Sequence, residues 1–220
     1  MPKRDELIRD LAGLASGVRR LPAPSLRALA WLAAAIPYVV AVAAAEGFRP
    51  DLAEKFLDAR FAVEQGAAFL TAIMAAFAAF CAVIPGRSQW LLLAPVPPLV
   101  VWLGSLGFGC LENWLRSGVE GLVLTPEWSC FPGIAMVGAF PAAAMAFMLR
   151  RGAPMYPRLG VALGGLAAAA LGDFGLRLFH TTDASLMVLV WQLGSVALLT
   201  ALAGLAGPWV HSWRRMPAGG

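Results

Sequence analysis

FAVEQGAAFLTAIMAAFAAFCAVI, residues 61–84, is the stretch of sequence that decides the fold. Its last twenty residues carry no charge, and about 20 apolar residues is the length that a helix needs to cross the hydrocarbon core of a bilayer. Short polar gaps separate it from five similar stretches. The six predicted spans are Leu26–Ala45, Phe61–Ile84, Trp90–Phe108, Phe131–Leu149, Leu159–Phe179 and Ala184–Val210. The sequence therefore predicts an all-α, polytopic membrane protein with six transmembrane helices.

The composition leaves little room for a soluble domain, because 60% of the residues are hydrophobic and only 14% are charged. We divide the chain into an N-terminal segment (1–25), the six-span domain (26–210) and a short tail (211–220). Any chemistry must lie in the loops, in the termini or in a few polar groups within the spans. The net charge of +4 suits anionic lipid headgroups and does not indicate nucleic acid as a direct partner.

The distribution of Lys and Arg predicts the orientation. Twelve of the seventeen basic residues lie in or next to the N-terminal segment, in the second and fourth gaps, or in the tail. By the positive-inside rule these parts face the cytoplasm, so both termini are expected to be cytoplasmic. The twelve residues are Lys3, Arg4, Arg9, Arg19, Arg20, Arg27, Arg87, Arg150, Arg151, Arg158, Arg214 and Arg215.

The N-terminal segment has the pattern of a short amphipathic helix. Leu7, Leu11, Leu14 and Val18 recur at steps of three and four, and Ile8 lies beside them. The other positions hold mainly charged residues, among them Arg4, Asp5 and Arg9. A helix this short is marginally stable alone in water, so it is expected to bind a surface. That surface is either the inner leaflet of the membrane or a cytoplasmic protein with a hydrophobic groove.

Two cysteines flank the second outward-facing loop. Cys110 is placed where the third predicted span ends, and Cys130 where the fourth begins. A disulfide between them would close a loop of about 20 residues and stabilise the fold by roughly 3 kcal/mol. The pair is either a static staple or a thiol pair whose oxidation or metal ligation pulls two helix ends together. His180 is a further candidate metal ligand, although no C-x-x-C or C-x-x-H spacing occurs.

Polar residues also lie near the outer end of the fifth span. Asp173 and Arg177 are four positions apart, share one helix face and are expected to form an intramembrane pair. With His180 they would form the polar outer site of a small membrane carrier or membrane enzyme, which is the alternative function. No catalytic motif such as H-E-x-x-H or G-x-S-x-G occurs, so we expect neither an enzyme nor a bound cofactor. A structural assembly factor is a third possibility.

Motifs along nearly the whole chain give it a family resemblance. The most specific are Arg20-Leu21-Pro22, Arg49-Pro50-Asp51-Leu52, Gly109-Cys110-Leu111, Trp128-Ser129-Cys130, Arg150-Arg151-Gly152-Ala153-Pro154 and Arg177-Leu178-Phe179-His180. In these stretches the chain resembles the NrsF-type negative regulators of sigma factors. It departs from them at Thr181 and Gln192, where proline and often histidine are expected.

The resemblance implies a membrane anti-sigma factor in the bacterial inner membrane. Such a protein holds a sigma factor of the extracytoplasmic-function (ECF) type inactive through its cytoplasmic face, and a pair of periplasmic cysteines is implicated in sensing oxidative or heavy-metal stress. Carried over to this sequence, Cys110 and Cys130 would be the sensing pair. The sigma-binding residues would be Leu7, Ile8, Leu11, Leu14 and Val18, with Arg4, Asp5 and Arg9 at the rim.

Overall fold

The computed structural model describes residues 2–14, 21–118, 130–153, 155–180, 190 and 193–212. These residues form helices and connections and no strand. Six helices are long and apolar enough to cross a membrane, which confirms the prediction of an all-α fold with six spans. Their bounds are Pro24–Glu46, Ala59–Cys81, Gln89–Ser117, Phe131–Leu149, Pro157–Leu176 and Leu193–His211.

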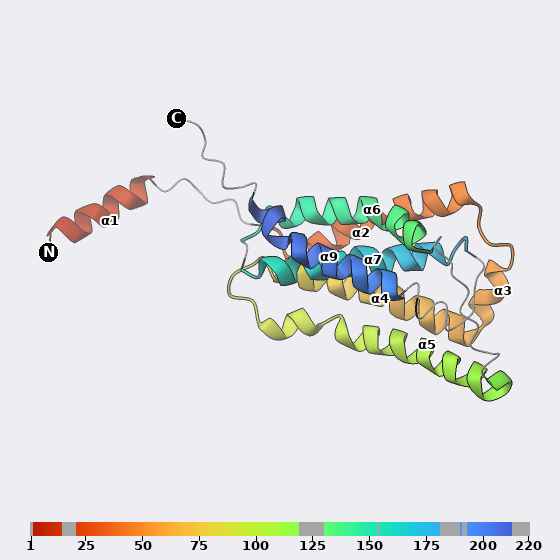
Figure 1. Ribbon diagram of the computed structural model, residues 1–220. Helices are drawn as coiled ribbons and strands as arrows, with labels where there is room; N and C mark the ends of the chain where they lie inside the picture. The colour runs from red at the N-terminus through yellow and green to blue at the C-terminus, as the bar shows by residue number, and fades with distance from the viewer. Residues whose placement is uncertain are drawn as a thin grey trace.

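The six long helices form one bundle in which successive spans run in opposite directions (Figure 1). In chain order the elements are α1 (Pro2–Leu14), α2 (Pro24–Glu46), α3 (Leu52–Leu57), α4 (Ala59–Cys81), the 3-10 helix η1 (Gln89–Leu93), α5 (Val96–Ser117), α6 (Cys130–Leu149), α7 (Pro157–Leu176) and α9 (Leu193–Ser212). The start of α2 and the end of α9 lie at one end of the bundle. We call it the proximal end, and the opposite end, where α3 lies, the distal end.

Helix α7 lies in the centre and packs against α4, α6 and α9. Small residues make this possible: a Cβ added at Gly172 would lie 2.7 Å from the carbonyl oxygen of Ile134 in α6. One added at Gly164 would lie 2.7 Å from Met145, also in α6. The repeat of small residues along α7 therefore brings helices together within the bundle.

The third span differs from its predicted bounds. It was expected to end at Phe108, but α5 continues to Ser117. The hydrophobic run stops where polar residues begin, but the helix continues through them. Glu112 and Arg116 form an i,i+4 ion pair of 2.5 Å, which favours the helical conformation. Cys110 therefore lies within a helix, about two turns before its end, and the prediction that it borders the loop was wrong.

The two terminal elements are described over part of their predicted extents. The N-terminal helix α1 begins at Pro2 and ends at Leu14. Val18 lies outside the described residues, as do the side chains of Leu11 and Leu14. The last span is described only from Leu193, so the predicted start at Ala184 also lies outside the described residues.

Candidate functional site

A group of charged side chains from the connection between α2 and α3, from α4 and α5 and from the C-terminal end of α7 gathers at the distal end. We call it the distal charge cluster and define it as Arg49, Asp51, Arg60, Glu64, Glu112 and Arg177. Six of the thirteen acidic residues in the sequence lie between Glu46 and Glu112, in or near this end. Buried charges are stable only when they are paired, so the pairing within the cluster decides how the helices are held.

Arg49 fastens the connection between α2 and α3 to the end of α7. Its side chain is buried, and Nε and Nη2 donate to the two carboxylate oxygens of Asp51 at 2.7 and 2.9 Å. Its backbone N–H donates to the carbonyl of Leu178 at 3.0 Å, and Nη1 donates to the carbonyl of His180 at 3.3 Å. The hydrogen bond from the Arg49 guanidinium lowers the pKa of Asp51. This bidentate pair stays charged at neutral pH and closes the distal end.

Arg177 and Glu64 form a buried ion pair between α7 and α4. Nη2 of Arg177 lies 3.1 Å from Oε2 of Glu64, and the two side chains are only 6% and 8% exposed. The Phe61 ring lies within cation–π distance of both Arg49 and Arg177, with guanidinium carbons 5.6 and 5.0 Å from its centroid. Aromatic and ionic contacts thus join the start of α4 to the end of α7.

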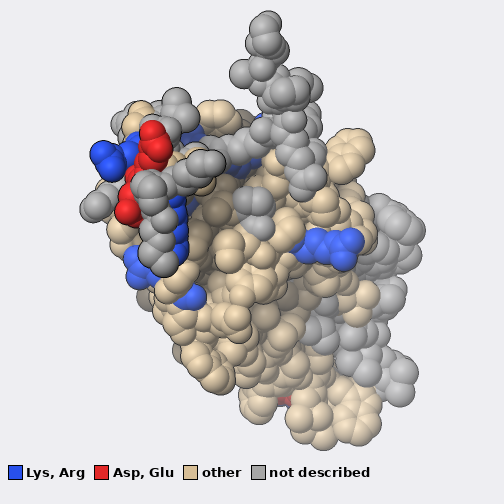
Figure 2. Space-filling view, turned by 90° about the vertical axis from the view of Figure 1, so that its left-hand side faces the viewer, with Lys and Arg blue, Asp and Glu red and all other residues tan. Residues whose placement is uncertain are grey.

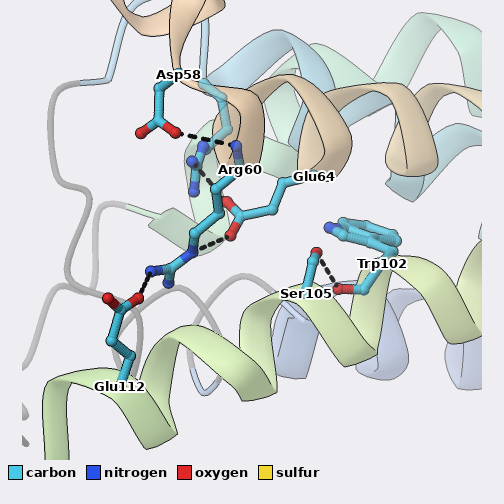
Figure 3. Close-up of polar contacts among 7 residues, drawn as sticks. Asp58, Arg60, Glu64, Trp102, Ser105 and Glu112 are labelled. Atoms are coloured by element: carbon cyan, nitrogen blue, oxygen red, sulfur yellow. Dashed lines mark hydrogen bonds and ion pairs between the residues drawn. The ribbon is translucent and has the colours of Figure 1, made fainter.

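Arg60 extends the cluster to α5, as Figure 3 shows. Its Nε donates to Oε1 of Glu64 at 3.1 Å, and Nη1 lies 3.6 Å from Oε2 of Glu112. The guanidinium lies directly over Gly109, where a Cβ would overlap with it. Only glycine at position 109 lets Arg60 cross to α5 in this conformation. A continuous series of ion pairs therefore joins α7, α4 and α5.

Cys110 is the residue after Gly109, over which the Arg60 guanidinium lies. It is half-buried and its thiol is free. Cys130 is the first residue of α6, and its side chain lies outside the described residues. Among the described residues no group of three His, Cys, Asp or Glu side chains is placed to hold a metal ion. A cysteine pair acting as a redox or metal sensor stays a prediction.

Asp173 and Arg177 lie together, as the sequence predicted, but the ion pair given above joins Arg177 to Glu64. Asp173 is 3% exposed, and its Oδ1 has no hydrogen-bond partner among the described residues. The Arg177 backbone N–H donates to the Asp173 carbonyl at 3.1 Å, as the turn of the helix requires. A side-chain pair between them stays a prediction.

At the proximal end, α1 stands apart from the bundle (Figure 1). Leu7 and Ile8 of its predicted apolar face are 58% and 55% exposed, and Arg4, Asp5 and Arg9 are exposed as well. Neighbouring apolar side chains on a detached helix are available to a partner surface.

The structure joins motifs that are far apart in the sequence. Arg49-Pro50-Asp51-Leu52 meets the segment from Arg177 to His180, and Gly109-Cys110-Leu111 meets both through Arg60 and Glu64. Sequence reasoning missed Glu64 and Arg60 as members of the site. A signal was present, because Glu64 is a charged residue inside a predicted span, and such residues mark functional or structural ion pairs.

These motifs lie within the part of the chain that matches a known family. The family model NrsF, described as negative regulator of sigma F, matches residues 11–213. No curated protein and no solved structure matches the chain. The family match covers both the span domain and most of the N-terminal segment, and the six long apolar helices make the chain a multi-pass membrane protein. The chain therefore belongs to the NrsF family of negative regulators of sigma F, and its partner is a sigma factor.

Proposed function

We propose that this protein is an inner-membrane anti-sigma factor that binds an ECF-type sigma factor with its N-terminal helix and releases it when the periplasmic side is stressed. The family match over residues 11–213 is the observation that carries the proposal. The positive-inside rule assigns the proximal end, with most Lys and Arg, to the cytoplasm. The distal charge cluster then faces the periplasm.

The exposed apolar face of α1 supports sigma binding. Amphipathic helices bind partner proteins by laying residues at i, i+3, i+4 and i+7 into a hydrophobic groove. Leu7 and Ile8 begin such a face, which Leu11, Leu14 and Val18 extend in the sequence. The charged residues Arg4, Asp5 and Arg9 would form the polar rim of the interface. The inner leaflet of the membrane is the competing surface for the same helix.

Sensing is assigned to Cys110 and Cys130. Oxidation would join the two sulfurs, with two electrons and two protons passing to the oxidant. A thiophilic metal ion would instead displace the thiol protons and bind both thiolates. Either event would pull the distal parts of α5 and α6 toward each other.

The distal charge cluster would carry this movement to the rest of the bundle. Cys110 adjoins Gly109, Arg60 lies on Gly109, and Arg60 contacts Glu64, which pairs with Arg177. A tenfold loss of sigma affinity requires a coupling free energy of only about 1.4 kcal/mol. A few partly buried ion pairs are sufficient for an effect of that size.

Co-purification tests the sigma-binding function. Each ECF sigma factor of the host would be incubated with the full-length protein in detergent, beside a variant that lacks residues 3–18. We expect one sigma factor to bind the full-length protein and to be lost with the deletion. No binding to either form would contradict the function, whereas equal binding to both would contradict the role of α1.

A carrier is the second candidate function, and buried Asp173 favours it. A carboxylate oxygen without a hydrogen-bond partner inside a bundle is a feature of ion and proton pathways. Under this alternative Asp173→Asn abolishes transport and deletion of residues 3–18 has little effect. The anti-sigma function predicts the reverse outcome for sigma binding.

A further inference from the structure

A cavity at the proximal end lies between two connections that the distal site does not involve. One connection joins α4 to η1 and the other joins α6 to α7, and both lie at the proximal end (Figure 1). The cavity has a volume of about 80 Å³, more than the ~10–15 Å³ that one water molecule needs by this kind of measure. Its lining includes Cys81, Arg87, Ser88, Gln89, Met155 and Tyr156.

The two connections are fixed to each other, so the cavity is preformed. The Ala153 N–H donates to the carbonyl of Val83 at 2.9 Å, and the Gln89 side-chain amide donates to the Tyr156 hydroxyl at 2.7 Å. Gly152 packs so closely on Val83 that a Cβ would lie 2.9 Å from the Val83 carbonyl oxygen. A preformed site binds without the cost of ordering its own loops.

The edge of the cavity combines apolar surface with a positive charge. Met155 is 53% exposed and Tyr156 is 39% exposed, although both follow directly on a tightly held turn. Arg87 is exposed beside them. This arrangement suits an apolar side chain in the cavity with a carboxylate next to it, where the guanidinium of Arg87 would donate hydrogen bonds.

The charge of the surrounding surface selects an acidic partner. No Asp or Glu occurs at positions 11–45, 65–111 or 128–172, which include every proximal connection of the bundle. The same connections carry Arg87, Arg150, Arg151 and Arg158. Figure 2 shows this end, with blue side chains at several places and red ones in one spot. A surface that carries more basic than acidic side chains attracts and orients acidic partners.

We infer that this cavity is a second docking site for the sigma factor, and that it receives an apolar side chain from an acidic segment of that protein. The inference rests on the proposed function and gives the partner a second point of contact beside α1. Residues 15–23 join α1 to α2, and a nine-residue segment spans at most about 30 Å. Two linked contacts on one partner raise the overall affinity through effective concentration.

The test measures sigma affinity with three full-length variants in lipid nanodiscs. The probe is each ECF sigma factor of the host, purified and titrated singly against the wild-type protein and the variants. Arg87→Glu and Met155→Asp alter exposed side chains at the cavity, so the fold is kept. Arg151→Glu is the matched control, because it makes the same charge change at the same end, where Arg151 lies over Phe147. We expect both cavity variants to weaken binding at least about tenfold and the control much less.

Several outcomes would overturn the inference. Equal losses in Arg87→Glu and Arg151→Glu would show that the overall charge of the surface acts, without a defined site. Unchanged sigma affinity in both cavity variants, with weaker retention of anionic phospholipid, would assign the edge to lipid headgroups. If the wild-type protein binds no sigma factor, the proposed function fails together with this inference. If the wild-type protein binds and the cavity variants bind equally well, only this inference fails.

A photo-crosslinker placed at Ser88 gives an independent readout. Ser88 lines the cavity, whereas Leu57 is 86% exposed at the distal end and serves as the control position. We expect crosslinks to sigma from position 88 only. If neither variant crosslinks although both still bind the sigma factor, the sigma factor does not dock at this cavity.

Discussion

Gly109→Ala is the substitution that most directly tests the link between α5 and α4. A Cβ at position 109 overlaps with the Arg60 guanidinium, so the side chain of Arg60 must move away. Arg60 is 31% exposed, and its long side chain has other staggered rotamers, so it can move without disturbing the helix backbone. The variant therefore loses the contact between Arg60 and Glu112 while Glu112 keeps its pair with Arg116.

The size of the effect follows from the geometry. The ion pair between Arg60 and Glu112 is 3.6 Å long, and the two side chains are 31% and 34% exposed. Pairs of this kind contribute about 0.2–1 kcal/mol. At the upper limit the equilibrium between sigma-bound and sigma-released forms shifts about fivefold, because 1.4 kcal/mol is a factor of ten. We expect transcription from a sigma-dependent reporter to rise by up to about fivefold in unstressed cells.

Gly107→Ala is the matched control. It lies on the same helix, and an added Cβ there meets no atom of the described residues within 4 Å. Both substitutions share the gain of up to about 1 kcal/mol that alanine gives over glycine in a helix, so their difference isolates Arg60. The double variant Arg60→Ala/Gly109→Ala should differ from Arg60→Ala only by this helix gain. Equal reporter activity in Gly109→Ala and Gly107→Ala would refute the link.

Three further predictions follow from other contacts. Glu64→Gln removes the carboxylate that pairs with buried Arg177 at 3.1 Å and should lower stability by about 3–5 kcal/mol, seen as a lower melting temperature in detergent. Arg116→Ala, which removes an exposed pair, is the control, and equal melting temperatures would contradict the account. Gly172→Ala places a Cβ 2.7 Å from the Ile134 carbonyl oxygen and should separate α6 from α7, giving a lower melting temperature than Gly104→Ala, where an added Cβ meets nothing described within 4 Å. Arg49 lowers the pKa of Asp51, so their pair contributes fully to stability above the ordinary Asp pKa of about 3.9. This contribution is lost as pH falls through the lowered pKa. Hydrogen exchange at residues 47–58 should rise in that acidic range, and Asp51→Asn should remove this pH dependence.

Hydrophobic length predicted most of the fold. Uncharged runs of about 20 residues specify spans, because a bilayer permits few alternatives to a helix. The end of α5 could not be predicted in this way, because hydropathy shows where the apolar run ends and not where the helix ends. Glu112 and Arg116 extend the helix beyond that point through their own ion pair.

The site was predicted less completely than the fold. Cys110 and Arg177 were singled out from the sequence, but their connection through Arg60 and Glu64 depends on how α4 packs between α5 and α7. That packing is a tertiary property, set by alanines such as Ala68, Ala72 and Ala75 that let the helices approach. Of the two residues that were missed, only Glu64 could have been identified from the sequence, because it is a carboxylate inside a predicted span.

The most direct test of the proposed mechanism measures sigma affinity in nanodiscs before and after treatment with a thiol oxidant. The full-length protein is compared with the double variant Cys110→Ser/Cys130→Ser. The account predicts that oxidation weakens sigma binding at least about tenfold in the wild-type protein and leaves the double variant bound and unresponsive. Sigma binding that oxidation leaves unchanged in the wild-type protein, or weakens equally in both proteins, would contradict it.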